Sequence, residues 1–226
     1  MSWRLDEVAK AGPEHLEPAY VERFDAKSPT DWTQTLDRLR AYGVGSDAVV
    51  VDLGAGTGSF AAALRPHVRR VIAVDVSPAM VSLLERRGLE AVRAGFLDYE
   101  HEGPPPAAVH TRNALHHLPD FWKAIALDRI ATLLRPGGVL LLDDLVFSFE
   151  PAAADASIEA WLAAAPLDAR EGWTREELAE HLRTEHSTFT WLLEPMLEHA
   201  GFEIRERRFS PSGIHASYDC LVASRR

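Results

Sequence analysis

The stretch Val49-Val50-Val51-Asp52-Leu53-Gly54-Ala55-Gly56-Thr57-Gly58-Ser59-Phe60 is the most informative part of this 226-residue chain. Its apolar start predicts a β-strand that is buried on both faces. Three glycines on alternate positions follow, and a helical pattern begins at Phe60. A strand, a glycine turn and a helix together open the kind of parallel α/β sheet that binds nucleotides. Glycine suits such a turn because it adopts a positive φ and lets a ligand approach the backbone closely.

The spacing of these glycines indicates which class of ligand the turn binds. A dinucleotide fingerprint, G-x-G-x-x-G, would need glycine at Ser59, whereas this chain has G-x-G-x-G with Asp52 two residues before the first glycine. About twenty residues on, the apolar run 71–74 ends in Asp75, whose carboxylate is placed to accept both hydroxyls of a ribose. The pattern therefore favours a nucleoside ligand other than NAD(P).

This combination resembles the class I S-adenosylmethionine (SAM) dependent methyltransferases, whose first motif looks like residues 52–58. The family's late motif, L-x-P-G-G before an apolar strand, looks like residues 134–138 followed by 139–142. The resemblance covers residues 45–145 well and 195–226 loosely. It implies a doubly wound, mostly parallel, seven-stranded α/β sheet with an antiparallel C-terminal edge. It also implies an enzyme that transfers the SAM methyl group to a small-molecule acceptor by in-line displacement and leaves S-adenosylhomocysteine (SAH).

The resemblance implies ten cofactor contacts: Asp52, Gly54, Ala55 and Gly56 at the methionine part, Asp75 at the ribose, Val76, Met80, Phe96 and Leu97 at the adenine, and Asn113 after the fourth strand. For Asn113 a turn role alone is an equal alternative. Family members often carry an acid directly after the glycine that follows strand three, but here that position is Phe96 and the acid is delayed to Asp98. Adenine recognition is therefore expected to rest on the backbone of Phe96 and Leu97, with Asp98 as a further candidate.

Candidate catalytic and substrate residues come from other segments. His116 and His117 are candidates for a general base near neutral pH, although adjacent histidines before a helix are often structural. Tyr20, Phe24 and His186 are candidate substrate contacts; the alternative is core packing for the two aromatic residues and helix capping for His186. A metal site from Asp143, Asp144 and His116 is conceivable, but nothing in the spacing specifies one, so no metal is expected.

The chain is expected to form one domain. We divide it into an N-terminal helical cap (1–45), a SAM-binding core (46–146), an inserted helical cover (147–190), and a C-terminal helix with two strands (191–226). The cap and the cover are expected to lie over the ligand. They would choose the acceptor, whose identity no motif reveals, and the oligomeric state is equally unreadable.

The composition of the chain limits the classes of binding partner and the cellular location that we expect. The net charge of −10 argues against binding nucleic acid through phosphate contacts. No run approaches the ~20 apolar residues that a membrane span needs. The single cysteine, Cys220, lies in an apolar stretch, which is expected of a packed thiol in a reducing cytoplasm.

Two other function classes compete with methyl transfer. An NAD(P)-dependent oxidoreductase is disfavoured by the missing third glycine of the dinucleotide pattern and by the two strands expected after Gly201. A SAM-binding protein without methyl transfer would keep the glycine turn and Asp75, so the sequence leaves that alternative open. Binding of NAD but not of SAM would identify the oxidoreductase.

Overall fold

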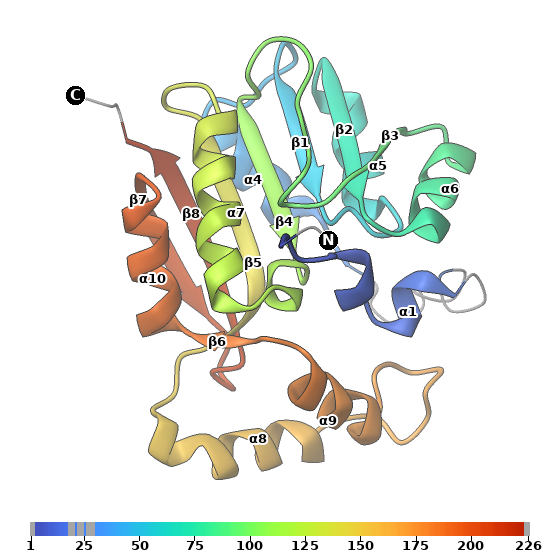
Figure 1. The fold of residues 1–226 in the computed structure, drawn as a ribbon, viewed down its shortest axis with the longest axis vertical. Coiled ribbons are helices and arrows are strands. Elements are labelled where there is room, and N and C mark those ends of the chain that lie inside the picture. Colours follow the sequence, from blue (N-terminus) through green and yellow to red (C-terminus); the bar gives the residue numbers. More distant parts are fainter. Residues whose placement is uncertain (1–2, 18–20, 22–24, 26–29, 224–226) are drawn as a thin grey trace.

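The computed structural model describes residues 3–17, 21, 25 and 30–223. Their centre is one sheet (Figure 1), in which seven strands follow the order β3-β2-β1-β4-β5-β8-β7 and the short β6 pairs with β5. The strands are β1 (Val49–Leu53), β2 (Arg70–Asp75), β3 (Glu90–Arg93), β4 (Ala108–Arg112), β5 (Val139–Phe147), β6 (Thr188–Phe189), β7 (Phe202–Phe209) and β8 (His215–Val222).

The strand directions confirm the predicted sheet. β1 pairs in parallel with β2 and β4, and β4 pairs in parallel with β5. β8 runs antiparallel to both β5 and β7, which makes the antiparallel C-terminal edge. The strand order reverses between β1 and β4, and open α/β sheets bind ligands at the carboxyl ends of the strands beside such a reversal.

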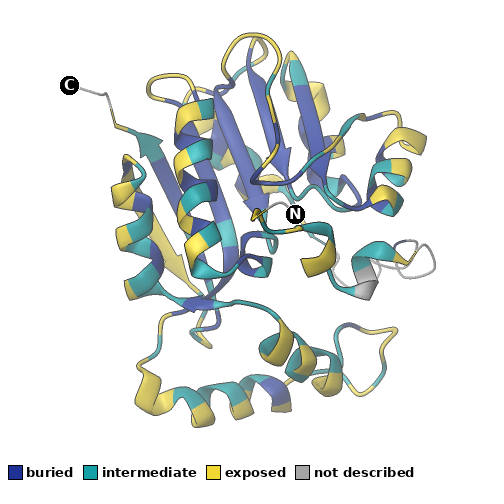
Figure 2. Cartoon of the chain, in the orientation of Figure 1, coloured by how far each residue is buried: buried dark blue, intermediate teal, exposed yellow. Residues whose placement is uncertain are grey.

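Helices cover both faces of the sheet, so the fold is doubly wound. Leu39, Phe60 and Leu84, from α4 (Thr33–Ala41), α5 (Ser59–Leu64) and α6 (Pro78–Arg86), are buried in the core on one face. Leu127 and Leu193, from α7 (Asp120–Leu133) and α10 (Thr190–His199), are buried in the core on the other. Accordingly, the strands in Figure 2 are mostly buried while the helices expose their outer surfaces. This part also contains the short elements η1 (Val8–Lys10), α1 (Pro13–Leu16), η2 (Arg65–His67) and η3 (Leu115–His117).

The segment after β5 leaves the sheet and lies beyond the carboxyl ends of the strands (Figure 1). It contains η4 (Pro151–Ala153), α8 (Ala154–Ala163) and α9 (Arg175–Thr184). Thr174 caps α9 with a capping box, in which Thr174 Oγ1 accepts from the backbone of Glu177 and the Glu177 side chain accepts from the backbone of Thr174. A small separate core around Leu145, Phe147 and Ile214 packs with Trp161 of α8 and joins this segment to the sheet.

The structure corrects the end of β5. The sequence suggested that this strand stops before Asp143 and Asp144, whereas it continues to Phe147. A strand can contain these acids because both are paired: Arg38 Nη1 of α4 lies 3.0 Å from Asp143 Oδ1, and Asp144 pairs with His116. Residues 188–189 form β6, and α10 follows it directly from Thr190.

The described residues before β1 contain the short elements η1 and α1 and the longer helix α4. Tyr20 and Phe24 lie outside the residues that the structure describes. Among the described residues, no helix is long and apolar enough to cross a membrane.

Candidate functional site

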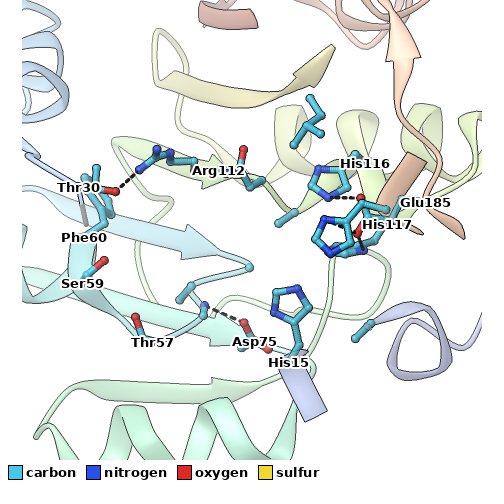
Figure 3. Close-up of a pocket in the computed structure, with 18 of the residues that line it drawn as sticks. His15, Thr30, Thr57, Ser59, Phe60, Asp75, Arg112, His116, His117 and Glu185 are labelled. Carbon is cyan, nitrogen blue, oxygen red and sulfur yellow. Dashed lines mark hydrogen bonds and ion pairs between the residues drawn. The ribbon is translucent and has the colours of Figure 1, made fainter. Parts of the chain in front are cut away.

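A cavity of about 550 Å³ lies at the carboxyl ends of β1, β2 and β4 (Figure 3). Most of the predicted cofactor residues line it, namely Asp52, Gly54, Ala55, Gly56, Asp75, Val76, Phe96 and Asn113. Both candidate catalytic histidines, His116 and His117, line it as well. Its far side is formed by the segment after β5, through Trp161, Trp173 and Leu178.

The glycine turn needs two of its glycines for different reasons. Gly54 has a φ of +72°, and a Cβ there would lie 2.4 Å from Cβ of Ala114. Gly56 has a φ of +54°, but a Cβ there would meet no described protein atom within 4 Å. Gly54 therefore lets β1 pack closely on the β4 loop, and Gly56 leaves room on the cavity side.

Asp75 ends β2 and is buried beside this turn. Its Oδ2 accepts from the Gly56 N–H (2.8 Å, dashed in Figure 3) and its Oδ1 accepts from the Ser77 N–H (2.9 Å). Burial raises the pKa of this carboxyl, and the two N–H groups partly counteract the rise. Each oxygen has acceptor capacity left for a ligand hydroxyl, because a carboxylate oxygen accepts more than one hydrogen bond.

Asp52 is the second buried acid at the turn. Its Oδ1 lies 2.7 Å from Nδ1 of His110, whose ring stacks on Phe60 at 3.8 Å between centroids. Its Oδ2 is buried and has no hydrogen-bond partner among the described residues. A buried carboxylate oxygen is costly without a donor, so this atom suits the amine of a methionine moiety. With Asp75 and the open face at Gly56, the residues present fit SAM.

The adenine end differs from the sequence prediction. Met80 is fully buried in α6 and is not among the residues that line the cavity, because it belongs to the core. Leu97 does not line the cavity either, and the N–H groups of Phe96 and Leu97 donate to Glu7 (2.8 Å each). Asp98 is turned back to accept from the Gly95 N–H (2.6 Å).

His116 is held between two carboxylates. Its Nδ1 hydrogen-bonds with Asp144, and its Nε2 lies 3.2 Å from Oε2 of Glu185 (Figure 3). Burial alone would lower the pKa of His116, but the charges and hydrogen bonds of Asp144 and Glu185 outweigh it and raise the pKa to about 10. The raised pKa favours the imidazolium form of His116, whose two ring nitrogens both face carboxylates.

His117 is the opposite case. Its Nδ1 is buried without a hydrogen-bond partner among the described residues, at 3.9 Å from Oε1 of Glu185. Burial and the positive charge of His116 lower the pKa of His117 well below its ordinary value. A neutral imidazole therefore faces the cavity, next to the ring of His15 at 5.2 Å.

The same cluster is the place where the described residues could hold a metal ion. The ligand atoms of His116, His117 and Glu185 lie within 4.8 Å of one another. However, the proton on His116 already supplies the positive charge that Asp144 and Glu185 require. The expected absence of a metal stays a prediction.

Sequence reasoning missed several residues of the site. Glu7, Arg112 and Glu185 all line the cavity, and Arg112 Nη1 donates to Thr30 Oγ1 (2.6 Å). Only Arg112 carried a local signal, since it ends a strand beside Asn113. The candidate His186 is not among the lining residues, and its backbone N–H donates to the carbonyl of His116 (2.8 Å).

Comparisons with known proteins agree with this geometry. A family profile described as "Methyltransferase domain" matches residues 24–207. An uncharacterized methyltransferase of Anoxybacillus flavithermus is 29% identical over 164 residues, which cover 66% of this chain and 77% of that protein.

Solved structures show the same fold at low identity. One is a putative methyltransferase in complex with the Haloferax volcanii Trm112 activator (TM-score 0.68, 16% identity, 92% of this chain and 96% of that chain). Another is magnesium protoporphyrin IX methyltransferase from Synechocystis with bound SAM (TM-score 0.64, 15% identity, 99% and 100%). Because the family profile spans more than half of the sequence, this chain belongs to the methyltransferase domain family and is a SAM-dependent class I methyltransferase.

Proposed function

We propose that this enzyme methylates a small molecule bound between the sheet and α8–α9. The observation that carries the proposal is the continuity of one cavity, which runs from Asp52 and Gly56 to Trp161 and Trp173. Its volume of about 550 Å³ is within the range of small-molecule sites, roughly 300–1,000 Å³. The indole rings provide apolar walls for a planar or apolar acceptor.

The charge of the chain supports this class of acceptor over a nucleic acid. The chain carries 34 acidic and 24 basic residues, so phosphate contacts would meet net repulsion.

The only cysteine, Cys220, is buried, and burial raises the pKa of its thiol to about 12. An inert thiol of this kind supports our proposal of a cytoplasmic location.

We assign the cofactor contacts from the positions of the buried acids. SAM supplies an electrophilic methyl group when it is bound. Asp52 would accept from its amine, Asp75 from its ribose hydroxyls, and the backbone from Gly54 to Gly56 would lie against its methionine part. Asn113 lines the same cavity and has a φ of +48°, a conformation that asparagine tolerates. These residues bind and orient, and such alignment is the main requirement of an in-line displacement.

We propose that His117, and not His116, removes the proton of the acceptor. His117 is neutral and its Nδ1 has no partner among the described residues, whereas both nitrogens of His116 are engaged by carboxylates. Burial and the positive charge of His116 would keep the pKa of His117 low, and Glu185, whose Oε1 lies 3.9 Å from Nδ1 of His117, would position the ring.

This assignment predicts the pH dependence of kcat. A base with a pKa below 6.5 stays unprotonated at neutral pH, so kcat should be level near pH 7 and fall only below pH 6.5. His117→Gln should lower kcat by roughly 10²–10⁴-fold and abolish this acid limb. An acid limb that persists in His117→Gln would assign the titration to another group.

The acceptor class can be tested before the acceptor is known. The enzyme is incubated with SAM bearing a deuterated methyl group and with a cell extract separated into metabolites and macromolecules. We expect mass spectrometry to find the label in the metabolite fraction. Label in RNA or protein alone would contradict the proposal, and label in neither fraction would favour a SAM-binding role without methyl transfer.

A further inference from the structure

The adenine end of the cavity lacks the acid that the family pattern leads one to expect. Phe96 stands at that position, and Asp98 accepts from the Gly95 N–H at 2.6 Å within its own turn. Asp98 borders a second, neighbouring hollow and not the main cavity. The local sequence therefore provides no carboxylate directed at the adenine.

Glu7 brings a carboxylate to the same turn from the N-terminal segment. The Phe96 N–H donates to its Oε2 and the Leu97 N–H to its Oε1, both at 2.8 Å. Glu7 also lines the main cavity, together with Val76 and Asp75. It thus lies where the adenine is expected when Asp75 binds the ribose.

The turn is shaped to admit this side chain. A Cβ at Gly95 would lie 2.4 Å from Oε1 of Glu7, so a larger residue at position 95 would exclude the carboxylate. Burial raises the pKa of Glu7, while the bonds from Leu97 and Phe96 lower it. The two backbone donors stabilise the charged form in a largely enclosed place.

The chemistry of the carboxylate indicates its ligand group. An ionised carboxylate only accepts hydrogen bonds, and each Glu7 oxygen keeps a free lone pair after one backbone bond. The exocyclic N6 amine is the hydrogen-bond donor on the edge of adenine. We propose that Glu7 recognises the N6 amine of the cofactor and so replaces the missing acid at position 96.

This role of Glu7 rests on the SAM dependence of the enzyme and not on the identity of the acceptor. It can therefore be tested by measuring the binding of cofactor analogues alone. Calorimetry compares SAH with its purine analogue, in which hydrogen replaces the N6 amine, on wild type, Glu7→Ala and Glu17→Ala. Glu17 is an exposed glutamate of the same segment and serves as the matched control. Both ligands are measured on each variant, so their affinity ratio does not depend on the folded fraction.

We expect wild type and Glu17→Ala to bind SAH about 10- to 100-fold more tightly than the purine analogue, because a hydrogen bond to a charged group contributes a difference of this size. In Glu7→Ala the affinity for SAH should fall by a similar factor and that for the purine analogue should not, so the preference disappears. Equal losses for both ligands would reduce Glu7 to a structural role. A gain in SAH affinity would show that Glu7 competes with adenine for the two N–H groups, which also overturns the proposal.

Discussion

At the scale of single residues, we expect Gly54 to be needed for the stability of the fold and Gly56 for the binding of the ligand. Alanine at Gly54 would force its Cβ to 2.4 Å from Ala114, whereas alanine at Gly56 meets no described protein atom within 4 Å. Gly54→Ala should therefore lower the melting temperature strongly. Gly56→Ala should cost only about 1 kcal/mol of stability from its positive φ, yet weaken SAH binding measurably. Melting curves and calorimetry of the two variants check this contrast, and it fails if Gly56→Ala binds SAH like the wild type.

His116 contributes to stability through the two carboxylates around it. In His116→Gln, Asp144 and Glu185 are left buried without their positive partner, which should cost about 3–5 kcal/mol. Because the folded-state pKa is raised to about 10 from 6.5, the contribution is complete below pH 6.5 and is lost as the pH rises toward 10. Urea unfolding of wild type and His116→Gln at several pH values measures it. If the difference in unfolding free energy between wild type and His116→Gln stays constant from pH 6.5 to 10, His116 is not the imidazolium that stabilises the fold.

At the scale of elements, α9 is expected to act on the acceptor side only. Thr174→Ala removes the capping box and should cost this helix about 1 kcal/mol. Amide hydrogen exchange in residues 175–184 should then become faster. The affinity for SAH should not change, because the residues that face the predicted cofactor site come from the sheet edge and the N-terminal segment. A parallel loss of SAH affinity would mean that α9 also holds the cofactor.

The elements also show what the sequence could predict. The glycine turn, Asp52 and Asp75 follow from local order, because a strand, a turn and a helix fix their relation within a few residues. Met80 was misplaced because the helix turns it into the core, which periodicity alone did not resolve. Glu7 and Glu185 could not be found from the sequence, because they meet Leu97 and His116 only after the chain has folded across 90 and 69 residues, respectively.

At the scale of the whole molecule, the binding edge is assembled from three separate parts of the chain. The sheet supplies Asp52 and Asp75, the N-terminal segment supplies Glu7, and the segment after β5 supplies Trp161 and Glu185. Arg38 further ties α4 to β5 and β8 through Asp143 (3.0 Å) and Asp219 (2.9 Å for Nε). The sheet is therefore the central frame of the site, and the two flanking segments complete the cavity.

We propose that an adenosyl ligand binds this edge of the sheet with its ribose on Asp75. Calorimetric titration of SAH into wild type and Asp75→Ala tests it most directly, with melting curves to verify that the variant is folded. We expect SAH to bind the wild type and its binding free energy to weaken by about 1–3 kcal/mol in the variant, because the ligand hydroxyls lose charged acceptors. Equal affinity of the two proteins for SAH would contradict it.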